Sequence, residues 1–594
     1  MQTLDYSVLL LYLAGIFLVG VVFSFRNKSE QDMFSAGGQS PWWAAGLSSF
    51  MTMFSAGTFV VWGGIAYRLG LVAVAINLCY GVAALLVGYF VAGRWKQIGV
   101  RTPAEYVRLR FGEGAVQFYT WFMTLGGIVG VGVAFYSLGV ILVAMMPLAE
   151  GNPLRDPETG NLALRWAVLL FGSVVVVYTM IGGLWAVLMT DVLQFIVLNL
   201  AVLFVIPLLL MRVGGFGEFY DNVPADFFSL TNGGYTWLFL FGWVVIHFFK
   251  VGVEWAFAQR FICVSSEKDA RKGAYLFGVL YLVSPLLWLL PPLLWRAEQP
   301  IPAGASDAEI QLLAEQAYIQ SCSAVLPAGM VGLLVAAMFS ATASMASSQL
   351  NVFAGVLTHD MYRPLIGKLA TSRHLLWAGR AFTLVLGVVL LVVSLLVPVL
   401  GGAERVIIAV ASLVTVPLLA PMLFGLFSRR VGRSAVWMTA GVCGVLGFLK
   451  YATLAGWIGL LMASLGVSVD LTGLVSWLSD YGPSIDIVLG VILPVAILGI
   501  LHLTARQTAG GWDRVEAARP VTSTPPSVST TDALMPAITV GVALLACGLL
   551  MAVLTVLNQA GRAPLVIFAM ILGVLGGAIL IWTRRQAKSA TNPA

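Results

Sequence analysis

The stretch LPAGMVGLLVAAMFSATASMASSQLNVFAGVLT, from Leu326 to Thr358, contains no charged residue and is long enough to cross a lipid bilayer as one α-helix. Its serines at spacing i, i+4, i+7 and i+8 share one face of that helix: Ser340, Ser344, Ser347 and Ser348. A hydroxyl that faces hydrocarbon is costly unless it has a polar partner. A row of hydroxyls indicates a partner that takes oxygen ligands, and a small cation is such a partner.

The whole chain has the composition of a helical membrane protein. Of its 594 residues 59% are hydrophobic and 10% are charged, and apolar runs recur from end to end. The net charge of +6 lies in short loops, so no nucleic-acid partner is expected. The 5 cysteines are scattered and form no C-x-x-C pair, so we expect neither a metal cluster nor a disulfide framework. Residues 1–5 carry no basic side chain, so the first apolar run is expected to be a span and not a signal peptide.

The apolar runs predict about fifteen membrane spans. They are Tyr6–Phe25, Pro41–Tyr67, Leu71–Ala92, Ala115–Leu148, Leu164–Ile181, Leu184–Met211, Trp237–Phe257, Ala274–Trp295, Leu326–Thr358, Leu375–Leu400, Val406–Phe427, Ala435–Leu465, Ile485–Leu503, Leu534–Leu557 and Pro564–Trp582. Alternate loops are basic, such as 94–110 and 429–433, and the loops between them are acidic or neutral. Because basic loops stay in the cytoplasm, we expect a multi-pass protein of the cell membrane with its N-terminus outside and its C-terminus inside.

Two loops stand out from the rest. Ser306–Gln320 has helical periodicity and predicts an external amphipathic helix. Gln507–Thr531 is rich in Pro, Ser, Thr and Ala and predicts a flexible cytoplasmic linker.

The second span, Pro41–Tyr67, is uncharged, but hydroxyl and glycine residues interrupt it. Among them are Ser55 and Thr58 on either side of Gly57. This composition is typical of a helix broken in mid-membrane, whose freed carbonyls can coordinate a cation. Small residues that allow close helix packing would explain it equally well.

Asp191 is the only charged residue between Trp166 and Met211, about two turns beyond a turn predicted at Gly182–Gly183. A carboxylate inside the membrane costs at least ~2.5–3.5 kcal/mol and is tolerated when it meets a cation or a wet path. The alternatives are a protonated carboxyl group and a purely structural hydrogen bond.

The span Trp237–Phe257 carries three titratable residues at helical spacing: His247, Lys250 and Glu254. Lys250 and Glu254 are i, i+4 neighbours and can neutralise each other, which would make the pair structural. The alternative is that this face lines a solute cavity, where His247 or Lys250 meets an anionic group.

These residues lie in segments that resemble the sodium/solute symporters, the family of the sodium/glucose, sodium/proline and sodium/sialic acid cotransporters. The most specific segments are GGLWAVLMTDVLQF at Gly182–Phe195 and LPAGMVGLLVAAMFSATASMASSQLNVFAGVLTHDMYRP at Leu326–Pro364. Weaker similarity is found in SPWWAAGLSSFMTMFSAGTFVVWGG at Ser40–Gly64, RTPAEYVRLRFG at Arg101–Gly112 and QRFICVSSEKDARKG at Gln259–Gly273.

The resemblance implies an all-α fold with a five-plus-five inverted-repeat core, like that of the leucine transporter, preceded by one extra helix. The expected organisation is an extra span and loop at 1–40, the transport core at 41–430, two spans at 431–505, the linker at 506–533 and two C-terminal spans at 534–594. The core is thus followed by about four extra helices.

The resemblance also implies two sodium sites and a solute cavity. The main sodium site falls on Met51, Phe54, Ala341, Ser344 and Met345, where Met345 departs from the Ser or Thr of relatives and is a poor sodium ligand. The second site falls on Asp191, Ser344, Ser347 and Ser348, which leaves Ser340 as a serine bonded to its own helix. The solute cavity falls on Ser55, Thr58, His247, Lys250 and Glu254.

The expected function is sodium-coupled symport of a small organic solute by alternating access, with sodium as coupling ion and no cofactor. The expected partners are the solute, sodium and the lipid bilayer, with no obligate protein partner. A proton-coupled symporter would keep Asp191 but titrate it. A membrane sensor would carry a fused soluble domain, which we do not expect here. No paired carboxylate, metal cluster or nucleophile constellation among the spans suggests an enzyme.

Overall fold

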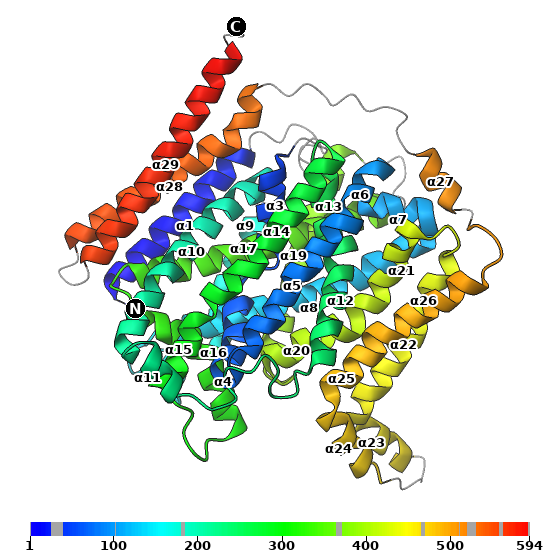
Figure 1. Ribbon diagram of the computed structural model, residues 1–594, viewed down its shortest axis with the longest axis horizontal. Coiled ribbons are helices and arrows are strands. Elements are labelled where there is room, and N and C mark those ends of the chain that lie inside the picture. The colour runs from blue at the N-terminus through cyan, green and yellow to red at the C-terminus, as the bar shows by residue number, and fades with distance from the viewer. Residues whose placement is uncertain are drawn as a thin grey trace.

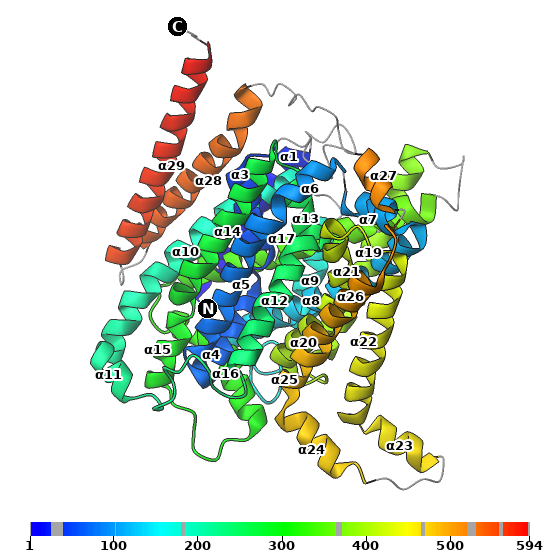
Figure 2. The same cartoon turned by 45° about the vertical axis from the view of Figure 1, so that its right-hand side comes forward.

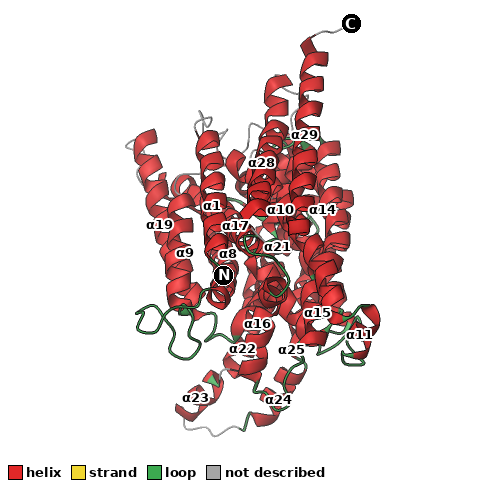
Figure 3. Ribbon diagram, turned by 90° about the vertical axis from the view of Figure 1, so that its left-hand side faces the viewer, coloured by secondary structure: helices red, strands yellow, loops and turns green. Residues whose placement is uncertain are grey.

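The structure is a computed structural model, and it describes residues 2–24, 40–100, 102–179, 184–363, 371–454, 456–464, 470–509, 511–518, 530–557 and 562–591. This part of the chain consists of helices and loops, without a strand (Figure 3). The helices form one bundle; the C-terminus projects beyond it at the top of Figure 1, and the N-terminus lies at its left side. The turn predicted at Gly182–Gly183 lies outside the described residues.

Each predicted span falls on a helix or on consecutive helices. Within the described residues, 10 helices are long and apolar enough to cross a membrane, and a bent pair would make 11. The protein is therefore a multi-pass membrane protein, and the count of fifteen spans stays a prediction.

The second span is broken, as its glycines and hydroxyls predict. Helix α3 (Trp42–Thr52) ends, and the chain resumes as a π-helical turn η2 (Thr58–Trp62) that leads into α4 (Gly63–Leu69). Hydroxyls satisfy the freed N–H groups: Thr58 Oγ1 accepts from Ser55 N at 3.2 Å, and Thr342 Oγ1 accepts from Ala56 N at 2.9 Å. Side-chain hydroxyls thus supply acceptors for the backbone N–H groups that the break leaves free.

The span predicted at Trp237–Phe257 is also broken, which its own residues do not indicate. Helix α12 (Trp237–Val253) and helix α13 (Trp255–Ile262) meet at an angle of 52°. Glu254 stands between them in an extended conformation, with φ −59° and ψ 136°. Trp95 Nε1 donates to the freed Gly252 carbonyl at 2.7 Å.

The two broken helices each begin one repeat of the inverted-repeat core. The first repeat continues through α5 (Val72–Phe90), α6 (Ala92–Ile98), α7 (Pro103–Phe111), α8 (Glu113–Met145), α9 (Leu164–Thr179) and α10 (Leu184–Val213). The second continues through α14 (Glu267–Trp288), α15 (Leu290–Glu298), α16 (Asp307–Ser323), α17 (Met330–Val356), η3 (Leu357–Tyr362), α19 (Ser372–Leu396), α20 (Gly402–Val410), η5 (Ala411–Thr415) and α21 (Val416–Phe427). Helices α10 and α17 pack against each other and against α3, so the aspartate helix, the serine helix and the first break are neighbours.

Helix α16 occupies the segment Ser306–Gln320 that was predicted to be an amphipathic helix, but its buried residues gather in its second half, from Ala314 to Cys322, and not along one face of the whole helix. Its N-terminus is a capping box, in which Ser306 and Glu309 satisfy each other's backbone N–H groups. Hydrogen bonds from the Ser306 backbone and hydroxyl lower the pKa of Glu309.

The extra N-terminal helix α1 (Thr3–Ser24) packs on α17 and α10. Its buried Asp5 accepts hydrogen bonds from Gly329 N at 2.6 Å and Gly332 N at 3.0 Å. A carboxylate at a helix N-terminus also complements the helix dipole, so Asp5 joins α1 to the start of the serine helix.

The helices after the core flank it on two opposite edges (Figures 1 and 2). One group is α22 (Arg433–Leu454), α23 (Trp457–Ser464), α24 (Thr472–Asp480), α25 (Gly482–Ile487), η6 (Val488–Ile492) and α26 (Leu493–Thr504); the other is α28 (Thr530–Leu557) with α29 (Arg562–Thr591). The span predicted at Ala435–Leu465 was too long, because α22 ends at Leu454 and α23 is a separate helix. Lys450 and Asp486 form a buried ion pair of 2.5 Å between α22 and α25.

Part of the predicted linker 506–533 is a docked helix, where we expected a flexible chain. Helix α27 (Gly511–Ala517) packs on α7, with Trp512 buried beside the Arg110 guanidinium. Arg514 Nε donates to the Leu109 carbonyl at 3.0 Å. Residues 519–529 of the linker lie outside the described residues.

Candidate functional site

Asp191 is buried where α10, α17 and α3 meet. Its carboxylate accepts two hydrogen bonds, from Ser344 Oγ of α17 at 2.5 Å and from Ser48 Oγ of α3 at 2.7 Å. Asp191 lies two turns after the start of α10 at Leu184, which is the depth that the sequence indicates. A carboxylate among hydroxyls inside a membrane offers the hard oxygen ligands that a small cation prefers.

The other serines of α17 have separate surroundings. Ser347 Oγ lies 2.8 Å from Thr179 Oγ1 of α9, and Ser348 is buried on the same face of α17. Ser340, which we expected to bond to its own helix, accepts a hydrogen bond from Gln194 Nε2 at 2.6 Å instead. Helices α9 and α10 thus place polar side chains against the serine face of α17.

The residues predicted for the main sodium site lie on two elements that are in contact. Met51 and Phe54 flank the end of α3, where the Met51 carbonyl accepts a turn hydrogen bond from Phe54 N at 3.0 Å. Ala341 and Ser344 are buried on α17. Met345 lies on α17 as well, but its side chain lines a cavity.

That cavity has a volume of about 170 Å³ and lies between the two helix breaks. All of the residues predicted for the solute cavity line it: Ser55, Thr58, His247, Lys250 and Glu254. Aromatic side chains form much of the remaining wall, among them Trp62, Tyr80 and Trp243.

The cavity contains both signs of charge. Lys250 Nζ and Glu254 Oε2 are 4.0 Å apart, and Gln349 Nε2 donates to Glu254 Oε1 at 3.3 Å. His247 Nδ1 lies 2.9 Å from the Trp243 carbonyl, and the imidazole ring packs on Tyr80 with ring centroids 3.8 Å apart. A neutral His247 that donates from Nδ1 keeps Nε2 as an acceptor.

Two residues at the ion site escaped the sequence reasoning: Ser48 and Arg260. Arg260 is buried on α13, and its Nε donates to Ser48 Oγ at 3.0 Å. The span predicted at Trp237–Phe257 ends before Arg260, so the sequence pattern does not place this residue among the buried charges. The segment QRFIC carries the signal that the sequence offers, an arginine that follows Gln259 just beyond the predicted span and precedes further apolar residues.

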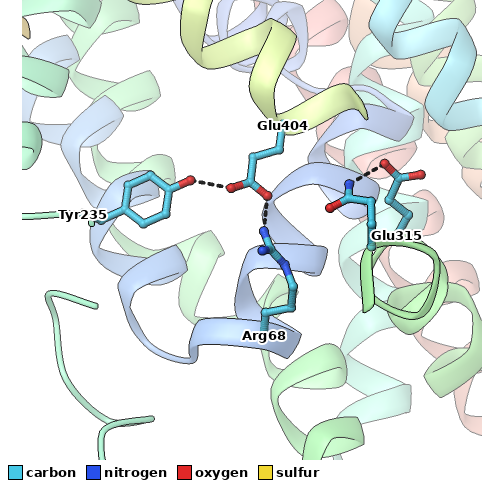
Figure 4. Close-up of polar contacts among 5 residues, drawn as sticks. Arg68, Tyr235, Glu315 and Glu404 are labelled. Atoms are coloured by element: carbon cyan, nitrogen blue, oxygen red, sulfur yellow. Dashed lines mark hydrogen bonds and ion pairs between the residues drawn. The ribbon is translucent and has the colours of Figure 1, made fainter. Parts of the chain in front are cut away.

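A polar cluster lies near the cavity at the end of α4, in the first half of α16 and at the start of α20 (Figure 4). Arg68 forms an ion pair with Glu404, and Tyr235 donates to Glu404 Oε1 at 2.5 Å. Glu315 lies beside these residues (Figure 4) and accepts a hydrogen bond from Gln311 Nε2 at 2.7 Å. Burial, reinforced by Glu404, raises the pKa of Tyr235, which keeps its hydroxyl a donor. The ion pair of Arg68 and Glu404 joins α4 to α20. Val406, two residues beyond Glu404, lines the cavity, so this junction lies at the edge of the cavity.

We expect Arg68→Ala to lower the free energy of unfolding by about 1–3 kcal/mol, because Glu404 keeps only its tyrosine partner. Thermal unfolding in detergent measures the loss. Arg108→Ala is the control, because its ion pair with Glu113 is exposed and is worth at most about 1 kcal/mol. Equal losses in the two variants would contradict a stabilising role of the cluster.

Two inverted repeats with broken first helices, a buried cluster of oxygen ligands and a cavity between the breaks define a secondary transporter. The family model described as "Sodium:solute symporter family" matches residues 33–442. The chain therefore belongs to the sodium:solute symporter family, whose members are sodium-coupled transporters and not enzymes.

Characterised relatives agree with this assignment. The chain is 27% identical to the sodium/sialic acid symporter NanT of Aliivibrio fischeri over 451 residues, which are 73% of this chain and 85% of that protein. It is 26% identical to the sodium/glucose cotransporter of Vibrio parahaemolyticus over 457 residues, 72% of this chain and 81% of that protein. A solved structure of a Na⁺-coupled sialic acid symporter in its substrate-bound outward-open state has the same fold, with TM-score 0.60 and 23% identity, covering 83% of this chain and 98% of the other.

Proposed function

We propose that the protein takes up a small organic solute together with sodium by alternating access. The observation that carries the proposal is the position of the cavity between the two helix breaks, beside the buried cluster of Asp191 and Ser344. Family membership supports sodium as the coupling ion. The helix contacts explain how an ion on α10 and α17 would affect the first break.

We assign the second sodium site to Asp191, Ser344, Ser347 and Ser348. Sodium at the Asp191 carboxylate would replace the hydrogen bond that Ser344 Oγ donates to it, and the Ser344 hydroxyl would rotate to turn a lone pair to the ion. The ion would thereby join α10 to α17 more firmly than the hydrogen bond does. We assign the main site to Met51, Phe54, Ala341 and Ser344, with Met345 as the position that lacks a suitable ligand.

The cavity residues support an anionic or zwitterionic solute. Lys250 offers a donor with a full charge, His247 can offer a ring nitrogen, and Ser55 and Thr58 lie at the opposite break. The relatives named for sialic acid and for glucose show that one family fold serves charged and uncharged solutes. We therefore relate the class of solute to the charged residues of this chain's own cavity.

We place the N-terminus outside and the C-terminus in the cytoplasm. The alternation of basic and acidic loops supports this orientation.

Met345→Ser is expected to strengthen the main sodium site, because it supplies the hydroxyl that relatives have at this position. Initial uptake rates as a function of sodium concentration should change from a Hill coefficient near one to a value approaching two. The matched control Met338→Ser places a hydroxyl elsewhere on buried α17. An unchanged sodium dependence in Met345→Ser would contradict the placement of the main site.

Uptake into proteoliposomes tests the function itself. A panel of sugars, amino acids, carboxylates and sialic acids is offered with an inward sodium gradient and, separately, with potassium in place of sodium. We expect accumulation of one solute class only with the sodium gradient. Uptake that follows a pH gradient and ignores sodium would identify proton coupling instead.

A further inference from the structure

Arg260 is a cation buried in the membrane part of the core. Its side chain lies on α13, the second half of the second broken helix, and is only 4% exposed. Nε donates to Ser48 Oγ at 3.0 Å, and Nη1 donates to the Ala256 carbonyl of its own helix at 2.6 Å. Nη2 has no hydrogen-bond partner among the described residues. A buried charge of this kind is costly unless an opposite charge is near.

The opposite charge is Asp191, which Arg260 reaches through one hydroxyl. Ser48 accepts from Arg260 and donates to Asp191 Oδ2 at 2.7 Å, so the hydroxyl is polarised from the cation to the anion. Within the described residues no carboxylate forms a direct ion pair with Arg260. The row Arg260–Ser48–Asp191–Ser344 therefore runs through α13, α3, α10 and α17, which include both broken helices.

We propose that Arg260 is the built-in counter-ion of Asp191, which neutralises the carboxylate through Ser48 when sodium is absent and opposes sodium when it binds. This inference rests on the sodium site assigned above. It makes Arg260 a positioning residue, because it acts on the ion through Ser48 and Asp191.

Two consequences follow for the transport cycle. Sodium binds Asp191 against the repulsion of a fixed positive charge, so Arg260 lowers the affinity for sodium and favours its release. After sodium has left, Arg260 compensates the carboxylate, so the empty transporter can return without a bare charge in its core.

The first test is the sodium affinity of purified Arg260→Gln, measured as the rise in melting temperature with NaCl at an ionic strength held constant with KCl. We expect the sodium affinity to rise about tenfold, because a nearby like charge is removed. Arg260→Lys keeps the charge and should restore an affinity near that of the wild type. An unchanged or weaker sodium affinity in Arg260→Gln overturns the proposal. Arg110→Gln removes another buried arginine, one that bonds to the carbonyls of Ser428 and Val431, and should leave the sodium affinity unchanged.

The second test compares net uptake with solute exchange in proteoliposomes. Exchange needs no return of the empty transporter, so Arg260→Gln should lose about tenfold in net uptake while exchange is retained. Equal losses in both modes would show a structural role and overturn the proposal.

A further variant covers the case that Arg260→Gln does not fold. Ser48→Ala leaves both charges in place but removes the hydroxyl through which Arg260 neutralises the empty site, so it should lower net uptake more than solute exchange. Equal losses of net uptake and exchange in Ser48→Ala overturn the proposal. The wild type distinguishes the two proposals. If NaCl does not raise the melting temperature of the wild type, the assigned sodium site is wrong. If the wild type responds to NaCl and the Arg260 variants respond equally, only the role proposed for Arg260 is wrong.

Discussion

Asp191→Asn should abolish most of the sodium stimulation of uptake. The variant keeps the size of the side chain but removes the negative charge at the meeting point of α10, α17 and α3. Breaking a buried charge pair costs about 3 kcal/mol or more, which corresponds to a loss of sodium affinity of roughly a hundredfold. Counterflow in proteoliposomes with and without sodium measures the effect, and Ser344→Ala should reduce the sodium dependence in the same direction.

The control for this experiment is Asp486→Asn. Asp486 is also a buried carboxylate, but its partner is Lys450 in the helices that follow the core. We expect Asp486→Asn to lose stability and to keep the sodium dependence of its remaining uptake. Because Asp191→Asn leaves Arg260 without its anion, the double variant with Arg260→Gln is the means to recover folded protein. Full sodium dependence in both Asp191→Asn and Ser344→Ala would refute the assigned sodium sites.

Lys250→Met should weaken the affinity for an anionic or zwitterionic solute by roughly tenfold or more, because a hydrogen bond to a charged group contributes about 1.5–3 kcal/mol. The lysine lies in the cavity wall, 4.0 Å from Glu254 at the second helix break. The KM of uptake measures the loss once the solute panel has identified the solute. Methionine keeps the length of the side chain, so a change in KM reports the charge and not the space.

Glu254→Gln gives the matched comparison on the other member of the pair. An anionic solute should bind this variant as well as the wild type or better, whereas a zwitterion should bind it more weakly. Unchanged solute affinity in Lys250→Met would contradict the proposal that the charge of Lys250 selects the solute. It would favour the alternative that Lys250 and Glu254 neutralise each other and have a structural role.

The sequence predicts the parts of this structure that depend on local chemistry. Asp191 is recognisable because a lone carboxylate in a long apolar run is costly, and the serine face of α17 because of its helical spacing. The break after α3 is recognisable from glycine and hydroxyl residues that can satisfy freed backbone groups. The fold and the family follow from the order of these segments.

What could not be predicted depends on contacts between distant segments. The bend at Glu254 is held in part by Trp95, which lies more than 150 residues earlier in the chain and donates to the Gly252 carbonyl. Arg260 looks like a loop residue until the bend directs α13 back against α3. The docking of α27 depends on Trp512 meeting Arg110, and low sequence complexity gives no sign of such a contact.

The four charges at the cavity and the ion cluster have a consequence for how the membrane voltage acts on transport. In the proposed cycle Asp191 and Glu254 balance Arg260 and Lys250, so these four groups would add no net charge to the return of the empty transporter. Voltage would then act on the sodium-loaded step, in which each ion gains ~2.3 kcal/mol per 100 mV. A tenfold sodium gradient adds ~1.4 kcal/mol, so one ion could sustain solute accumulation of roughly a few hundredfold and two ions the square of that. The residue at position 345 would thereby set the steepest solute gradient that the cell can hold.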